Sequence, residues 1–398
     1  MLQRKTDLYL HHTKTNTIIS SLSNTSTTKF HHSVLLSKKS KVVISFLLIL
    51  FTSSIVYAQD NISSNWIRPA SEKDPPIYGI KNGIVVGLWP SNLESTQKNS
   101  EGGPRGLLRI GYNYSGATYL INFIAVEPVV DDDMEFSEVS PSVVDDAWGK
   151  LFWASDSING NRFSTNTYAK GVITHPDSLH PSTEELTVYV FMEKFLNGAH
   201  PYLKLSIRSD APGELCLQIF NAANSATMQR CALTATMGNY SRLRLLYLKD
   251  TIIDSRQLFN GYNGIDFAEK NPYTHNQMLR TKKGDYMVAA ESNEDFTQLA
   301  SWPQQPAYLQ KWSWRYRPFF KLTQYWRKDV ADTDSSLEVR VNGRVKYWGG
   351  ESTNPNDYIN IPGGAAFENF ELREKYHAGK KFYFGLSLKP AKELIDSF

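Results

Sequence analysis

The chain has 398 residues, with 43 Lys and Arg against 40 Asp and Glu, so its formal net charge is +3. Hydrophobic residues make up 41% and charged residues 21%, a globular composition that excludes a mainly disordered, collagen-like or coiled-coil chain. The length is compatible with two domains or with one large β domain.

The N-terminal region has the form of a secretory signal. Three lysines precede the apolar segment 42–58, which ends in small residues and predicts cleavage before Gln59. A retained signal anchor is the alternative, but a spanning helix needs about 20 apolar residues. We therefore expect residues 1–58 to be an N-terminal extension with a signal peptide. The mature protein would be secreted or periplasmic, with no stable membrane insertion after cleavage.

Removing this leader changes the charge balance. Residues 1–58 contain seven Lys and Arg and one acidic residue, which leaves 36 basic and 39 acidic residues in 59–398, a net charge of −3. A general nucleic-acid partner would require a basic surface. The sequence therefore predicts no nucleic-acid binding, and any anionic partner must be held by a few local cations.

Strand-sized runs of alternating polarity predict the fold class. Many such runs, bounded by Gly, Pro, Asn, Asp or Ser, follow one another along 59–398. Helical periodicity is scarce, and 145–153 and 291–300 are the best helix candidates. Because helices do not alternate with strands, a doubly wound α/β fold is disfavoured. We expect an all-β protein, a β-sandwich or jelly roll with a few short helices, in which 59–398 form a single large domain.

The two cysteines, Cys216 and Cys231, flank a small polar segment. A two-residue turn at 223–224 would place them directly opposite each other in a hairpin. In an exported protein, a disulfide there and a pair of buried thiols are equally acceptable interpretations. Two cysteines without a histidine cluster argue against a structural zinc site.

Familiar catalytic and metal motifs are absent from the sequence. It has no G-x-S-x-G elbow, P-loop or H-E-x-x-H. His175 and His180 flank a loop, where either could serve as a base, but their spacing is not a known metal pattern. The acidic run 131–135 could bind a structural Ca²⁺, although a solvated loop is the commoner outcome. We predict no cofactor and no metal site beyond that possibility.

Aromatic and basic residues are interleaved over 302–327. In an extended strand Trp314 would lie on one face and Arg315 and Arg317 on the other. Arginine forks pair with carboxylate or sulfate groups, and aromatic rings can stack on sugars. The alternative is that the tryptophans are core residues and the arginines rim the sheet.

Two further groups are candidate site residues. Arg242 and Arg244 point the same way in an extended strand, so they could clamp an anion or simply face solvent. Tyr325 is our candidate acid and base, with Lys321 on the same strand face lowering its pKa.

These residue types suit β-elimination on a uronic-acid glycan. The reaction needs a cation or amide donor on the uronate carboxylate, a base for the C5 proton and an acid for the leaving oxygen. With water as the leaving group, the same elimination is a dehydration. The chemistry requires no cofactor and no tight motif.

Two segments, 102–130 (GGPRGLLRIGYNYSGATYLINFIAVEPVV) and 363–386 (GGAAFENFELREKYHAGKKFYFGL), resemble exported proteins of marine polysaccharide-degrading bacteria. They are similar to ulvan-degrading lyases and related oligosaccharide dehydratases. The resemblance implies β-elimination on a sulfated rhamnose-uronate polymer. It assigns no catalytic positions. Arg105, Asn122 and Glu127 in the first segment are either site residues or strand-end hydrogen-bonding groups, and the latter is commoner.

The sequence therefore predicts an exported carbon–oxygen lyase acting by β-elimination on a uronic-acid-containing sulfated polysaccharide or its oligosaccharides. A non-catalytic glycan-binding protein is one alternative. A glycoside hydrolase is another, and it would need two carboxylates across the sugar. Its candidates on strand-like runs, which spacing alone cannot pair, are Glu127, Glu193, Glu338 and Glu371.

Overall fold

Two large β-sheets account for most of the structure. The computed structural model describes residues 65–88, 104–160, 168–176, 178–236, 241–293, 315–316, 322–348 and 358–398. Within it, Ile62–Phe398 forms one compact unit. The predicted leader lies outside the described residues, as do three of the predicted site residues, namely Trp314, Arg317 and Lys321.

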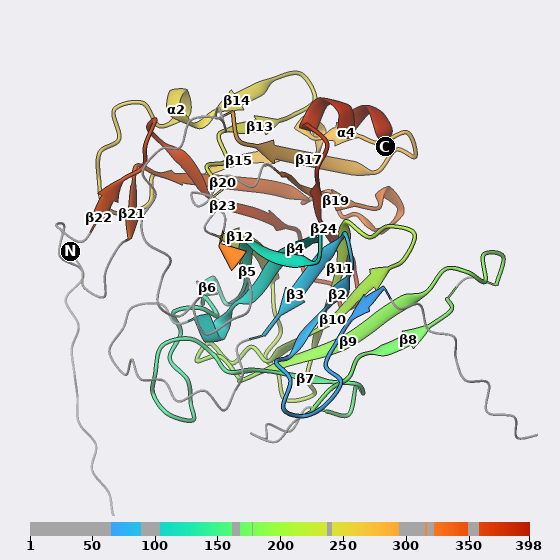
Figure 1. Cartoon of the computed structure of the whole chain (residues 1–398). Coiled ribbons are helices and arrows are strands. Elements are labelled where there is room, and N and C mark those ends of the chain that lie inside the picture. Colours follow the sequence, from blue (N-terminus) through green and yellow to red (C-terminus); the bar gives the residue numbers. More distant parts are fainter. Residues whose placement is uncertain are drawn as a thin grey trace, which may run out of the picture. The chain divides into compact units, whose positions relative to one another are not determined.

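The first sheet combines strands from both halves of the chain (Figure 1). Its order is β1 (Trp66–Ile67), β2 (Ile77–Ile80), β3 (Ile84–Gly87), β4 (Leu108–Tyr114), β5 (Ala117–Val130), β12 (Arg230–Thr236), β23 (Ala366–Arg373), β20 (Glu338–Arg344) and β15 (Asn271–Thr274). Two short strands also pair with β5, namely β6 (Asp133–Met134) and β18 (Arg315–Tyr316). The β18 pairing is parallel, whereas the neighbours along the main order are antiparallel.

The second sheet also combines strands from both halves of the chain. Its order is β14 (Ile252–Asp254), β13 (Leu245–Tyr247), β17 (Tyr286–Glu291), β19 (Thr323–Lys328), β24 (Lys381–Ser387), β11 (Glu214–Asn221), β10 (Pro201–Arg208), β9 (Glu185–Met192) and β7 (Phe152–Ser155). The strand β16 (Leu279–Arg280) pairs with β17, and β8 (Val172–Thr174) pairs with β9.

The remaining elements are short. The strands β21 (Lys346–Trp348) and β22 (Tyr358–Asn360) form a separate pair. The described helices are α2 (Ser255–Leu258) and α4 (Ala391–Ser397), with single 3-10 turns η1 (Pro104–Gly106), η2 (His275–Gln277) and η3 (Val330–Asp332).

The inner faces of the two sheets share one apolar core. Successive side chains of a strand point to opposite faces, so on β12 Leu233 and Ala235 join the core while Thr234 points outward. Trp326 of the second sheet donates its indole N–H to the carbonyl of Phe370 in the first, at 2.8 Å. The predicted all-β sandwich is confirmed, while the jelly-roll connection pattern stays a prediction.

The two predicted helices do not form as expected. Residues 145–153 are turns and extended chain leading into β7, and Trp148 forms an isolated bridge with Pro141. Of 291–300, Glu291 ends β17 and 294–300 lie outside the described residues. Neither α2 nor α4 was expected from the sequence, and α4 begins after Pro390 and buries its Ala391.

The predicted hairpin between the cysteines is also wrong. Cys216 lies on β11 in the second sheet, and Cys231 lies on β12 in the first. The strands diverge because β11 pairs with β10 and β24, whereas β12 pairs with β5 and β23. Both cysteines are free thiols, so the candidate disulfide does not form.

Reducing agent should therefore leave stability unchanged. A native disulfide contributes about 2–4 kcal/mol, so its absence predicts the same melting temperature with and without dithiothreitol. Because burial raises the pKa of both Cys216 and Cys231, thiol reagents should label two thiols per chain only after denaturation. A lower melting temperature under reduction would contradict this assignment.

Candidate functional site

The outer face of the first sheet carries charged side chains over its central strands. Thr234 on β12 pairs with Glu371 on β23. Ala232, which points to the same face of β12, pairs with Glu127 on β5. Glu127 is 2% exposed and Glu371 is fully buried. Carboxyl groups are rarely buried unless they are paired, so this face needs a compensating charge.

Lys270 supplies that charge. Its Nζ lies 2.9 Å from Oε2 of Glu371 and 3.9 Å from Oε2 of Glu127. Because both oxygens contact one nitrogen, they are at most about 7 Å apart, an upper bound that is compatible with the spacing of paired catalytic carboxyl groups. Lys270 also lies over the ring of Phe136, 5.8 Å from its centroid. Lys270 also acts on the carboxyl group of Glu138, in the segment after β6. We call Glu127, Glu138, Lys270 and Glu371 the Lys270 cluster.

Two carboxyl groups of the Lys270 cluster have pKa values raised towards neutral pH. Burial, reinforced by the charge of Glu371, raises the pKa of Glu127 to about 8 although Lys270 opposes the shift. Burial also raises the pKa of Glu138 to about 7, against the opposing charges of Arg344 and Lys270. A general acid or base works best when its pKa lies near the working pH. The cluster therefore offers two groups suited to proton transfer.

Glu371 is held between two cations. Its Oε1 lies 3.3 Å from Nε of Arg373, and its other oxygen meets Lys270. Arg373 in turn pairs with Glu338 at 2.7 Å. This chain of ion pairs runs across β23 and β20 and fixes the Glu371 carboxylate relative to Lys270.

The segment carrying Glu138 is fastened to β5. Ser137 accepts a hydrogen bond from Val126 N at 2.9 Å and donates one to the carbonyl of Gly106 at 2.6 Å. A Cβ on Gly106 would lie 1.7 Å from the Ser137 carbonyl oxygen, so only glycine permits this approach. Glu138 is therefore positioned by a packed backbone contact.

Glu193, a candidate carboxylate from the sequence, fixes the loop at 142–151. It accepts hydrogen bonds from the Ser142 hydroxyl and from the backbone N–H groups of Val143 and Leu151. Lys150 strengthens the same region by donating to two backbone carbonyls. Because its described bonds satisfy loop groups, Glu193 has a structural role here.

Arg242 and Arg244 are fully buried rather than exposed. Arg244 donates to the carbonyls of Pro362, Gly364 and Ala365, at 2.7–3.2 Å. Arg242 adopts a left-handed backbone with φ of 47° and is 1% exposed. The Arg244 guanidinium therefore binds a loop of this chain.

Tyr325 lies on the other side of the sandwich. It points outward from the second sheet, packs with Ala391 and Leu394 of α4, and meets the ring of Phe398 at 5.4 Å. Burial, and then the charge of Glu214, raises the pKa of Tyr325 above its usual value, the opposite of what activation as a base requires. The structure therefore does not bring Tyr325 to the Lys270 cluster.

The loop histidines are exposed. His175 follows β8 and its Nδ1 lies 3.0 Å from the carbonyl of Pro181. His180 is exposed in the same loop. Neither histidine shows the burial of a tuned catalytic base.

Arg105 and Asn122 make internal contacts. Arg105 forms a two-pronged bond to Asp145 at 2.8 and 3.0 Å. Asn122 donates to Gln324 at 2.7 Å, which joins the two sheets inside the core. Arg315 lies on β18, beside β5. Of the first segment's candidates, only Glu127 joins the Lys270 cluster.

The acidic run 131–135 turns the chain between β5 and β6, with Asp131 and Asp132 in left-handed conformations. Among the described residues, no group of three or more His, Cys, Asp or Glu is arranged to hold a metal ion. In the same part of the chain, none of the helices combines the length and apolar character needed to cross a membrane.

Comparisons with known proteins add no family assignment. No protein-family model matches the chain, and no curated protein sequence and no solved structure is a significant match to it. The resemblance of 102–130 and 363–386 to ulvan-degrading enzymes therefore stays a prediction. These two segments do supply Glu127 and Glu371, on β5 and β23.

Glu127→Gln should make stability less dependent on pH. The pKa of Glu127 is raised from 4.5 to about 8 on folding, so the folded state holds a proton that the unfolded state releases between these values. Wild-type stability should therefore fall as pH rises from 4.5 towards 8. The variant should gain on the order of a few kcal/mol relative to wild type at pH 9 and little at pH 4.

Chemical denaturation across this pH range measures the effect. Glu72→Gln, at an exposed position, is the matched control and should show no such relative gain. If Glu127→Gln is equally destabilising at both ends of the range, Glu127 is not the buried protonated group described here.

Proposed function

We propose that the protein is an exported carbohydrate-active enzyme that performs β-elimination on a uronic-acid-containing, sulfated glycan. The observation that carries the proposal is the Lys270 cluster, in which Lys270 and Glu138 from connecting segments meet Glu127 and Glu371 on the outer face of a sheet. Two of these carboxyl groups, Glu127 and Glu138, titrate near neutrality.

The first step of the reaction is neutralisation of the substrate carboxylate. Lys270 provides a cation, and protonated Glu127 provides an O–H donor. A carboxylic acid kept neutral in a buried site is a strong hydrogen-bond donor to an oxyanion. Both contacts strengthen as negative charge moves onto the uronate carboxyl group, so they acidify the C5 proton.

Glu138 then transfers protons. As a carboxylate it removes the C5 proton, the C4–O bond breaks, and a C4=C5 double bond forms. The departing oxygen needs a proton, and Glu138 can donate the one that it removed from C5. With its pKa near 7, the carboxyl group is poised for both roles at neutral pH. Cleavage of a glycosidic bond and loss of water from the sugar share this mechanism and differ only in the leaving group.

Glycoside hydrolysis is a second candidate, which the Glu127–Glu371 pairing favours. In that reaction Glu127 would protonate the leaving oxygen, and the Glu371 carboxylate would act from the other side of the sugar. Their separation of at most about 7 Å spans the retaining and the lower inverting range. Against this role, Glu371 is already engaged by Lys270 and Arg373.

The two reactions leave different products. We expect incubation of the mature protein with ulvan, its oligosaccharides, alginate or pectate to produce the ultraviolet absorbance of a 4,5-unsaturated uronate. New reducing ends without that absorbance would indicate hydrolysis. Binding without any product, measured by calorimetry, would indicate a glycan-binding protein and overturn both enzymatic proposals.

Single substitutions locate the chemistry. Glu138→Gln should lower kcat by about 100-fold or more, because a general base is lost, while the substrate still binds. Tyr325→Phe should leave kcat near the wild-type value, since Tyr325 lies under α4 in the second sheet. If Tyr325→Phe loses activity and Glu138→Gln does not, Tyr325 is the acid and base, as the sequence predicted.

The pH profile gives an independent readout. Activity should rise as Glu138 loses its proton near pH 7 and fall as Glu127 loses its proton near pH 8, which gives a narrow bell. In Glu127→Gln the alkaline limb should disappear, because the amide does not titrate. An unchanged alkaline limb in that variant would exclude Glu127 as the source of this pKa.

A further inference from the structure

Arg344, at the end of β20, is a partly buried cation with long polar contacts. Its Nη1 lies 3.9 Å from Glu368 Oε1, and its Nη2 lies 3.5 Å from the carbonyl of Ile265. Both distances exceed those of a good charge-assisted hydrogen bond. Although the side chain is only 14% exposed, Nε has no hydrogen-bond partner in the described part of the chain.

Two other arginines have closer carboxylate partners than Arg344. Arg373 meets Glu338 at 2.7 Å, and Arg105 takes Asp145 in a two-pronged bond. Burying a guanidinium without close acceptors is costly. Arg344 thus differs from these structural arginines and retains the capacity to bind an additional anion.

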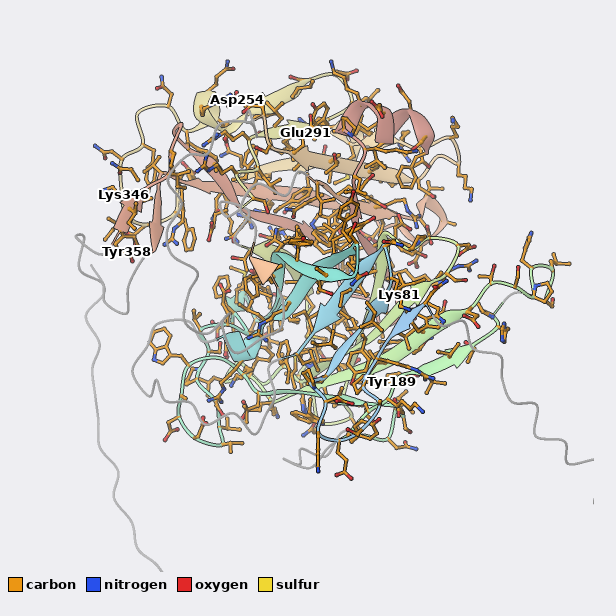
Figure 2. All side chains as sticks on the ribbon, in the orientation of Figure 1. Lys81, Tyr189, Asp254, Glu291, Lys346 and Tyr358 are labelled. Atoms are coloured by element: carbon orange, nitrogen blue, oxygen red, sulfur yellow. The ribbon has the colours of Figure 1, made fainter. Side chains whose placement is uncertain are left out.

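Aromatic rings hold the Arg344 guanidinium in place. Phe267 lies beneath it with a centroid distance of 4.4 Å, and the ring of Tyr358 is 6.0 Å away. Phe267 is 47% exposed, so one part of its apolar surface faces solvent beside the cation. Tyr358 lies with Lys346 on the β21–β22 pair at the left margin of Figure 2.

This group adjoins the Lys270 cluster. Arg344 and Lys270 are the two cations that act on the Glu138 carboxyl group. The chain around Lys270 also lies against the end of β20, because Ala268 N–H donates to the carbonyl of Gly343 at 2.8 Å and Asn271 pairs with Val341. An anion held at Arg344 and another held at Lys270 would therefore lie on neighbouring segments of the same sheet edge. Adjacent sugars of a charged glycan carry separate anionic groups, one of which could bind each cation.

We propose that Arg344, Phe267 and Tyr358 form a subsite for a sulfated sugar next to the sugar that reacts at the Lys270 cluster. The guanidinium binds the sulfate through its planar fork, and the exposed surface of Phe267 packs on the sugar ring. This inference rests on the glycan site proposed above and assigns its second anionic position.

Calorimetry with a sulfated uronate oligosaccharide prepared from ulvan, and with its chemically desulfated counterpart, tests the proposal. Arg344→Gln should weaken binding of the sulfated ligand by about tenfold or more and leave binding of the desulfated ligand unchanged. Phe267→Ala should weaken binding of both ligands to a similar degree. Arg344→Lys keeps the charge but not the fork, so its affinity for the sulfated ligand should be intermediate.

Arg280→Gln is the matched control, because its guanidinium also lies over a ring, that of Tyr286 at 3.4 Å, but in the second sheet. It should bind both ligands as wild type does. Thermal melting shows whether each variant is folded, and Arg344→Lys carries the test if Arg344→Gln is not.

Three results would overturn the subsite. They are unchanged affinity of the folded Arg344 variants, equal losses for both ligands in those variants, and no binding of either ligand by wild type. The outcome separates this inference from the proposed reaction. If sulfate-dependent binding needs Arg344 but no product forms with any glycan, the subsite stands and the β-elimination proposal fails.

Discussion

Lys270 lies within 4 Å of both Glu127 and Glu371. This contact offsets part of the cost of burying two carboxyl groups on the outer face of the first sheet. Two carboxyl groups that are almost fully buried would otherwise carry a large desolvation cost. Burial and the nearby charge of Glu371 outweigh the opposing charge of Lys270 and raise the pKa of Glu127 to about 8. The electrostatic compromise that stabilises the sheet face is the same property that suits it to acid–base chemistry.

The sandwich positions this chemistry through simple geometry. Alternation along β5, β12 and β23 sends apolar side chains into the core and places Glu127, Thr234 and Glu371 on the other face. Connections outside the strands complete the site, because Lys270 comes from the chain before β15 and Glu138 from the segment after β6. A rigid sheet thus fixes two carboxyl groups, and the connecting segments bring the groups that tune them.

The sequence was sufficient for the fold class and for part of the site. Alternating runs predict strands because the side-chain period is local, and Glu127 and Glu371 stood out as acidic residues on such runs. Their partnership depends on β12 lying between β5 and β23, a long-range pairing that no local pattern encodes. The same limit explains the wrong cysteine hairpin, since β11 and β12 enter different sheets. Lys270 and Glu138 lie in connections without periodicity, so no sequence signal marked them.

A crystal structure of the Glu138→Gln variant with a bound ulvan oligosaccharide tests the central claim most directly. The substitution blocks the proposed proton transfer and keeps the Lys270–Glu371 contact. We predict that the glycan lies on the outer face of the first sheet, with a uronate carboxylate within hydrogen-bonding distance of Lys270 and Glu127. A glycan bound on the outer face of the second sheet, or away from Lys270, would contradict the account.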